Sequence, residues 1–282
     1  MSEAAPPRVD FHTHSNHSDG TLTPTELVTL AHARNVQLLA LTDHDTTAGC
    51  AEAAAACTSL GMRFINGIEL TCGWRGREIH MVGLRVDPAS ETLAAHTLDL
   101  AQRRRARIIA IGARLTRLGM NGAQLAEAAL AQCPAPTRMH LARLLLAEGA
   151  VAEPQAAFDR WLGRGKPAFV SAEWPDIATT AACIVEAGGL PVLAHPHRYP
   201  LSNGALRELC TEFKQAGGTG IEVSLAGASP DDAARAASLA RRFELAGSIG
   251  SDFHEPGLPW RPLGRFVKLP DQVTPITQLL NA

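Results

Sequence analysis

The sequence predicts an α/β barrel that carries an inserted helical subdomain. Three observations support this fold class. From Arg8 onward, short apolar runs alternate with helical segments, a pattern that favours a parallel sheet or barrel. Between about Glu91 and Gly163 the periodicity is helical only. Histidines and carboxylates follow the apolar runs, and barrel enzymes place their chemistry at the ends of strands. We therefore predict a barrel domain over 1–88 and 170–282, with the helical insert over 89–169.

Composition indicates a folded enzyme of ordinary size. The 282 residues suffice for one large α/β domain, and 46% hydrophobic with 19% charged residues exclude a disordered chain. The formal charge of −2 gives no general attraction for polyanions, so we expect no binding to duplex DNA. Any nucleotide or single-stranded RNA must be bound by local Arg and Lys side chains.

The cysteines and the N-terminus favour a cytoplasmic protein. Six cysteines are scattered without a CxxC pair, so we expect reduced thiols. The opening Met-Ser-Glu-Ala-Ala-Pro-Pro lacks a basic region followed by an apolar run, and no stretch resembles a membrane span. We expect no membrane partner, and the sequence does not indicate the oligomeric state.

Local signals define the first helix well. Thr23 is a capping residue, Pro24 occupies the first helical position and Glu26 the third, which together predict a capping box. This helix should end near Asn35. A second, alanine-rich helix is expected from about Thr47 to Leu60.

The strands are predicted from apolar runs between turn residues. Gly73 to Gly76 should supply a tight connection between two of them. The expected strands run into Phe11 and over residues 36–41, 62–70, 78–84, 190–194, 220–223 and 245–250.

Nine side chains at or near strand ends are candidate metal ligands. In Asp10-Phe11-His12-Thr13-His14, two imidazoles stand two residues apart, so both project to the same side of an extended chain and can reach one cation. The nine candidates are His12, His14, Asp19, His44, Glu69, His80, His195, Asp252 and His254.

This donor set predicts a cluster of divalent cations. Nitrogen and carboxylate ligands without cysteine suit Zn, Mn or Fe, and a bridging carboxylate such as Glu69 or Asp252 would allow two or three ions. We take manganese as the first choice, with zinc or iron as alternatives. Such clusters acidify a shared water and neutralise phosphate oxygens, so they hydrolyse phosphate esters well.

The competing interpretation is that these histidines are ordinary core or surface residues. For a single histidine that interpretation would be preferred, but six of them with three carboxylates near strand ends favour a metal centre. His32, His96 and His140 lie within helical patterns and are interpreted as surface or packing residues. His17, in the loop between His14 and Asp19, is left unassigned.

Five motifs resemble those of the PHP (polymerase and histidinol phosphatase) family. They are Asp-Phe-His-Thr-His-Ser with Ser-Asp-Gly-Thr, then Leu-Thr-Asp-His-Asp, Gly-Ile-Glu-Leu, Ala-His-Pro and Gly-Ser-Asp-Phe-His, in the family's order. The resemblance covers the chain apart from the helical insert. It implies a distorted seven-stranded (β/α) barrel, similar to the TIM barrel and to amidohydrolases, with two or three metal ions.

The resemblance also implies how the ligands divide. One metal would be held by His12, His14, Glu69 and Asp252, and a second by Glu69, His80 and His195. A third would lie on Asp19, His44 and His254, and Asp252 is also the expected catalytic carboxylate.

Within the family the chain looks most like 3′,5′-nucleoside bisphosphate phosphatases and 5′-to-3′ exoribonucleases. Thr-Leu-Thr-Pro-Thr-Glu-Leu, the compact insert and Pro-Thr-Arg-Met-His-Leu-Ala-Arg-Leu-Leu carry this likeness. It implies removal of the 3′-phosphate from adenosine 3′,5′-bisphosphate, giving AMP and phosphate, or trimming of short 5′-phosphorylated RNA.

A bisphosphate needs cations beyond the metals, because an unpaired buried phosphate is costly. We expect Arg138, Lys166 and Arg198 to contact phosphate. The run of Arg103, Arg104, Arg105 and Arg107 wraps around a helix and is interpreted as a solvated face.

Further polar residues at strand ends are candidates for substrate binding, proton transfer or orientation of ligands. Glu222 and Ser224 could bind ribose or a base, and local loop contacts explain them almost as well. His197 is a candidate general acid, because an imidazole titrates near neutral pH. Asp43 and Asp45 are candidates for orienting ligand histidines.

The sequence allows two alternatives to a nucleotide phosphoesterase. A small-molecule phosphatase of the histidinol-phosphate type would need an acidic contact for an ammonium group, which Glu222 could supply. A non-catalytic, polymerase-associated regulatory module is disfavoured because every ligand position is filled.

Overall fold

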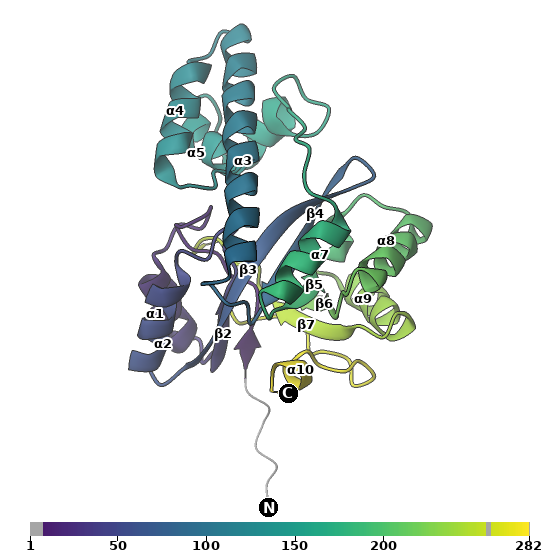
Figure 1. Ribbon diagram of the computed structural model, residues 1–282. Helices are drawn as coiled ribbons and strands as arrows, with labels where there is room; N and C mark the ends of the chain where they lie inside the picture. The colour runs from purple at the N-terminus through teal and green to yellow at the C-terminus, as the bar shows by residue number, and fades with distance from the viewer. Residues whose placement is uncertain (1–7, 258–260, 282) are drawn as a thin grey trace, which may run out of the picture.

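The computed structural model describes residues 8–257 and 261–281, which form a seven-stranded sheet that curves into a nearly closed barrel. The strands neighbour one another in chain order (Figure 1). The first and last strands approach where Phe11 N donates to Ile249 O at 3.0 Å. The strands are β1 (Val9–Asp10), β2 (Leu38–Leu41), β3 (Arg63–Trp74), β4 (Arg77–Leu84), β5 (Leu190–Leu193), β6 (Gly220–Leu225) and β7 (Ala246–Gly250).

The sheet is mixed, although the strand and helix alternation favoured a parallel one. β4 runs antiparallel to both β3 and β5, and the other neighbouring pairs are parallel. The cause is the two-residue turn at Arg75 and Gly76, whose φ angles of 47° and 71° are both left-handed, as tight hairpins require. β3 therefore continues to Trp74, beyond the expected end at Leu70.

Helices cover the outside of the barrel. The predicted capping box is present, since Glu26 N donates to Thr23 Oγ1 at 3.2 Å and Thr23 N donates to Glu26 Oε2 at 2.8 Å. The first helix ends at Ala33, two residues before the expected position. These outer helices are α1 (Pro24–Ala33), α2 (Cys50–Ser59), α7 (Ile177–Glu186), α8 (Asn203–Gln215) and α9 (Pro230–Arg242), with a short α10 (Thr277–Leu280) near the C-terminus.

Strand residues alternate between the two faces of the barrel wall. Leu39 and Leu41 pack in a cluster with α1 and α2, whereas Leu38 and Ala40 belong to a separate cluster with Val192 of β5. This period of two buries both faces of a central strand.

The predicted insert is helical and has its own core. Ile108, Ile111, Leu125 and Leu141 are buried together in a cluster apart from the barrel. The insert stands over one end of the barrel (Figure 1), and its bounds at 89–169 stay a prediction. Its elements are α3 (Glu91–Arg117), α4 (Gly122–Gln132), α5 (Arg138–Ala147), α6 (Pro154–Ala157) and a π-helical turn (Phe158–Leu162).

The cysteines agree with the expectation of reduced thiols. All six cysteines are buried and free, so no disulfide joins them. Across residues 8–257 and 261–281, each helix is too short or too polar to traverse a lipid bilayer.

Two glycines allow α3 and α4 to pack closely. A Cβ atom on Gly122 would lie 2.0 Å from the carbonyl oxygen of Gly112 and 2.6 Å from the backbone nitrogen of Thr116. Backbone atoms cannot move aside as a flexible side chain can, so any larger residue would force the helices apart.

We predict that Gly122→Ala lowers the free energy of unfolding by about 1–3 kcal/mol, the usual cost of overpacking. The measurement is chemical denaturation. Gly204→Ala in α8 is the control, because the nearest atom to its new Cβ is 3.7 Å away. Equal stability of the two variants would contradict the close contact.

Candidate metal centre

The structure brings all nine candidate ligands together at the end of the barrel that lies beneath the insert. His12, His14, His44, His195 and the Asp252/His254 pair follow strands, and Asp19 comes from the loop after β1. Glu69 and His80 lie within β3 and β4, because this hairpin extends past the end of the neighbouring strands. Eight of the nine are buried, and His80 is partly exposed.

The first group is formed by His12, His14, Glu69 and Asp252. His12 Nε2 lies 3.1 Å from His14 Nε2, 3.2 Å from Glu69 Oε2 and 3.3 Å from Asp252 Oδ1. One potential ligand atom from each residue lies within 4.8 Å of the others. These are the four residues that the family resemblance implies for one metal.

Glu69 connects this group to a second one. Its Oε1 atom lies 3.0 Å from His80 Nδ1 and 2.9 Å from His195 Nε2. Its Oε2 atom lies 3.0 Å from His44 Nδ1. Each oxygen therefore faces a different set of imidazoles, as a bridging carboxylate must.

The third group surrounds Asp19. Asp19 Oδ1 lies 3.1 Å from His254 Nε2 and 3.7 Å from His44 Nε2. His14 is close enough to join this group. The three predicted ligand sets therefore lie next to one another, with His14 and His44 between neighbouring sets, and their assignment to separate metal ions stays a prediction.

Buried polar atoms without partners show that the cluster fits cations. Asp19 Oδ1, Glu69 Oε2 and His44 Nδ1 are buried, and although each faces a neighbour of the cluster at about 3 Å, none forms a hydrogen bond of acceptable geometry among the described residues. Unsatisfied buried groups are rare and costly in folded proteins. Divalent cations would satisfy all three, and this set of imidazoles and carboxylates suits manganese, zinc or iron.

The protonation states favour metal binding by at least two of the imidazoles. Burial, with the neighbouring His254, lowers the pKa of His14 to about 3. Burial also lowers the pKa of His195 to about 4, even though Glu69 opposes the shift. Both rings are therefore neutral at pH 7 and can offer a nitrogen lone pair.

The central carboxylate is ionised despite its position. Burial raises the pKa of Glu69, but the neighbouring His44 and His12 outweigh it and hold the pKa well below its usual range. Asp252 behaves in the same way, with Arg198 and Arg261 as the largest opposing influences. The cluster thus contains buried negative charge that cations can neutralise.

Asp43 fixes the loop that carries His14 and Asp19. Its carboxylate accepts hydrogen bonds from Ser15 N at 2.7 Å, Ser15 Oγ at 2.6 Å and Ser18 Oγ at 2.6 Å. The proposed orienting role of Asp43 therefore acts through this loop, because its carboxylate bonds to two serines of the loop.

Asp45 connects the His44 loop to the insert. It accepts hydrogen bonds from Thr71 N at 2.7 Å and from the buried guanidinium of Arg104, which also donates to Thr71 Oγ1 at 2.7 Å. The interpretation of the arginine run as a solvated face is wrong for Arg104 and Arg107, which are 5% and 7% exposed. Both side chains turn toward carboxylates of the barrel.

The insert also holds a metal-ligand candidate directly. Thr137, the N-cap of α5, donates from Oγ1 to Asp19 Oδ2 at 2.8 Å, and Arg143 donates to Asp19 O at 2.7 Å. Sequence analysis assigned no role to either residue. His140 is a buried packing residue, as expected, and its Nδ1 accepts a hydrogen bond from Thr137 N.

A cationic group lies beside the cluster on the insert side. Arg107 Nη1 lies 2.8 Å and Arg138 Nη2 3.5 Å from the carboxylate of Glu78, so two guanidiniums share one carboxylate. Burial, together with Arg138 and Arg104, lowers the pKa of Arg107 to about 10 despite Glu78. This excess of positive charge is suited to an anion.

Two more arginines lie on the barrel side. Arg198 forms an ion pair with Asp252, and Arg261 Nη1 lies 3.2 Å from Asp252 Oδ2. Arg261 was missed because its loop has no strand-end pattern. Lys166 is exposed in a loop of the insert, and within the described ranges no hydrogen bond or ion pair joins its side chain to the cluster.

The structure gives Glu222 and Ser224 partners inside the protein. Glu222 is buried, and its two oxygens bond to His12 Nδ1 and to His195 N, each at 2.6 Å. The buried Ser224 hydroxyl donates to Val267 O. The strand-end pattern predicted substrate contacts at these two residues, and their partners inside the protein do not favour such contacts.

His197 lies in a short 3-10 turn (Pro196–Arg198) next to the cluster. Burial and the adjacent Arg198 lower its pKa, so its ring is unprotonated at neutral pH. This state does not favour the general-acid role that the sequence suggested.

Comparisons with known proteins agree with this geometry. Residues 10–126 match the PHP domain family. The chain is 42% identical to the 5′-3′ exoribonuclease of Haemophilus influenzae, over 95% of this chain and 97% of that protein. It is also 42% identical to the 3′,5′-nucleoside bisphosphate phosphatase of Chromobacterium violaceum, over 97% and 96%. A solved structure called an amidohydrolase, also from C. violaceum and with bound sulfate, superposes with a TM-score of 0.91 at 41% identity, covering 97% of this chain and 96% of that one.

We predict that Glu222→Gln weakens Mn²⁺ binding about 10- to 100-fold, the usual cost of losing a partner behind a histidine ligand. Glutamine keeps the size but not the charge that holds the Nδ1–H of His12. Isothermal titration with Mn²⁺ measures the effect, and circular dichroism checks the fold. Glu212→Gln in α8 is the control, and equal affinity in the two variants would refute the role.

We also predict that, in chelator-treated protein, the contribution of His80 to the free energy of unfolding depends on pH. Burial disfavours its protonated ring, but Glu69 and Glu78 outweigh burial and raise the pKa to about 10. Because this folded-state pKa exceeds the ordinary 6.5, the stabilisation is complete below about pH 6.5 and is lost as pH rises through 10. Denaturation of wild type and His80→Gln should therefore converge toward pH 10, and a constant difference from pH 6 to 10 would contradict the assignment.

Proposed function

The chain belongs to the PHP family, and on this basis we propose that it is a metal-dependent phosphoesterase acting on nucleoside 3′,5′-bisphosphates. The reaction would release the 3′-phosphate, giving AMP from adenosine 3′,5′-bisphosphate, and short 5′-phosphorylated RNA is a second substrate class. The observation that carries the proposal is the cluster of nine buried or partly buried ligands centred on Glu69, with arginines on two sides. The names of the two relatives support the choice of substrate.

The proposed ligand sets follow the three groups of the structure. His12, His14, Glu69 and Asp252 would hold one cation, and Glu69 with His80 and His195 a second. Asp19, His44 and His254 would hold a third, with manganese as the first choice. Bound cations of this kind supply an acidified water and neutralise the charge of phosphate oxygens.

The protein side chains would then position the phosphates. Asp252 presents Oδ1 toward His12 and His14 and Oδ2 toward Arg198 and Arg261, so it is placed to orient both a cation and the attacking water. Arg198 and Arg261 would donate to oxygens of the scissile phosphate as charge shifts to the leaving oxygen.

A second phosphate would lie on the insert side. Arg138 begins α5, and the 3.5 Å distance between its Nη2 and Glu78 Oε1 is too long for a strong hydrogen bond, so it can reorient toward an anion. Lys166 would add charge from its exposed loop. With cationic side chains on two sides, the site would favour a substrate with two separated phosphates over one with a single phosphate.

The alternative substrate class loses its main support. A histidinol-phosphate-type substrate needs a carboxylate for its ammonium group, and both oxygens of Glu222 already bond to His12 and His195. We further propose that the protein is cytoplasmic. We also propose that it does not bind duplex DNA, because the formal charge of −2 provides no general attraction for a polyanion.

The direct test is phosphate release from adenosine 3′,5′-bisphosphate with Mn²⁺. We expect AMP and phosphate from the wild type, and no release from His195→Ala, which removes a ligand. His32→Ala, at an exposed position of α1, is the control and should keep full activity. Absence of release by wild type whose metal content has been verified would refute the proposed reaction.

Arg138→Ala separates binding of the second phosphate from the chemistry. We expect KM for the bisphosphate to rise at least about tenfold, as for loss of one charge-assisted contact worth 1.5–3 kcal/mol, while kcat changes little. Hydrolysis of adenosine 3′-monophosphate should be nearly unaffected, and Lys166→Ala should act in the same direction. Equal losses with both substrates would contradict the placement of the second phosphate.

A further inference from the structure

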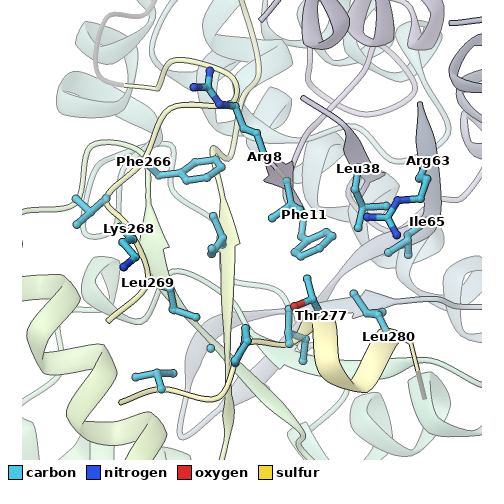
Figure 2. A pocket seen from close by; sticks show the side chains of 18 of the residues that line it. Arg8, Phe11, Leu38, Arg63, Ile65, Phe266, Lys268, Leu269, Thr277 and Leu280 are labelled. Atoms are coloured by element: carbon cyan, nitrogen blue, oxygen red, sulfur yellow. The ribbon is translucent and has the colours of Figure 1, made fainter. Parts of the chain in front are cut away.

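A cavity lies at the opposite end of the barrel from the metal centre. Its volume is about 1250 Å³, and its walls include Val9, Leu38 and Arg63, which begin the first three strands. The C-terminal segment 264–281 forms the facing wall, and none of the nine candidate ligands lines the space (Figure 2). This cavity is therefore independent of the proposed reaction.

The cavity arises from the way the barrel closes. β1 has only two residues, and the backbone bonds at the seam with β7 come from the residues that follow it: Phe11 N donates to Ile249 O at 3.0 Å, and His12 O accepts from Asp252 N at 2.8 Å. The C-terminal segment is held against β7 by Gly247 N donating to Thr274 O at 2.8 Å and Ile276 N donating to Gly247 O at 2.9 Å. The segment thus covers the seam between the two strands without filling it.

The walls of this cavity are largely apolar. Phe11, Leu38, Ile65, Leu269 and Leu280 surround it from four parts of the chain (Figure 2). Apolar surface that remains hollow in a folded protein commonly marks a ligand site, and this volume exceeds the roughly 300–1,000 Å³ of most small-molecule sites. A long flexible hydrocarbon chain would fit such walls better than a polar nucleotide would.

The charged residues around the cavity are mostly positive. Arg8, Arg63, Arg265 and Lys268 line it, together with one carboxylate, Asp271. That carboxylate already pairs with Lys268 at 2.9 Å. Arg63 and Arg265 form no ion pair with any residue that the structure describes, although the whole chain carries a formal charge of −2.

One of the positively charged side chains, Arg63, lies directly beside the apolar wall. Its side chain lies beside Leu38 and Ile65, whereas Lys268 lies across the cavity and Arg8 stands at another part of the rim (Figure 2). An occupant with an apolar body and one negative end would bury the body against the walls and leave the charge near a guanidinium.

We propose that this cavity binds a free long-chain monocarboxylate of the fatty-acid type. The hydrocarbon chain lies along the partly exposed Ile65, Leu269 and Leu280, and the carboxylate is bound by Arg63 or Arg265. Hydrophobic burial supplies most of the binding free energy, and the guanidiniums select an anion over a cation.

The experiment is isothermal titration of the full-length, Mn²⁺-loaded chain with dodecanoate below its micelle concentration. We expect saturable binding of one molecule per chain. Dodecyltrimethylammonium, which has the same alkyl chain with a positive head group, should bind at least tenfold more weakly. Adenosine 3′,5′-bisphosphate should not compete, because it would occupy the other end of the barrel.

Two variants test the two halves of the proposal separately. The double variant Arg63→Glu with Arg265→Glu should weaken dodecanoate binding at least tenfold and reduce the preference for the anion. Ile65→Trp should weaken both amphiphiles by filling the cavity. Arg207→Glu, a charge reversal at an exposed position of α8, is the matched control and should leave binding unchanged. Circular dichroism verifies that each variant is folded.

Several results would overturn the proposal. These are absence of saturable binding to wild type, equal affinity for the anionic and cationic amphiphiles, or unchanged affinity in both cavity variants. Sedimentation showing that wild type is a dimer which Ile65→Trp dissociates would assign the cavity to a second copy of the chain. Binding to phosphatidylglycerol vesicles but not to free dodecanoate would assign it to a membrane surface.

Discussion

The burial of the Glu69 carboxylate is the constraint on which the rest of the site depends. Glu69 is fully buried, and its two oxygens lie within 3.3 Å of nitrogen atoms from five histidines. An isolated buried carboxylate would be costly, so it requires positive charge from protonated imidazoles or from cations. Because its oxygens face different ligand groups, one side chain fixes the spacing of the whole cluster. The strands that supply the ligands must therefore converge on β3.

The insert is part of the site as well as a cover for it. Thr137 and Arg143 hold Asp19, and Arg104 pairs with Asp45 beside His44. These contacts join the helices of the insert to the loops that carry ligands, so the position of the insert and the geometry of the cluster depend on each other. Breaking one partner of such a buried pair is typically far more costly than losing a surface ion pair.

The sequence could predict which side chains gather in the cluster because their signal is local. Each candidate stands at or near a strand end, and the barrel brings strand ends together whatever the exact pairing. Partners far apart along the chain were not predictable in this way. Arg104 meets a carboxylate 59 residues away, and Glu222 meets His12 210 residues away, so a helical pattern or a strand end could not show that these charges are buried against each other. The tight connection expected at Gly73 to Gly76 is present as the turn at Arg75 and Gly76, but the alternation of strands and helices favoured a parallel sheet and so did not show that β4 runs antiparallel.

The central claim is that Glu69 bridges cations at the end of the barrel beneath the insert. Anomalous diffraction from crystals soaked in Mn²⁺ tests it most directly. The account predicts at least two peaks, each within coordination distance of a different Glu69 oxygen, and their loss or marked weakening in Glu69→Gln crystals. Peaks located elsewhere, or unchanged peaks in the variant, would contradict it.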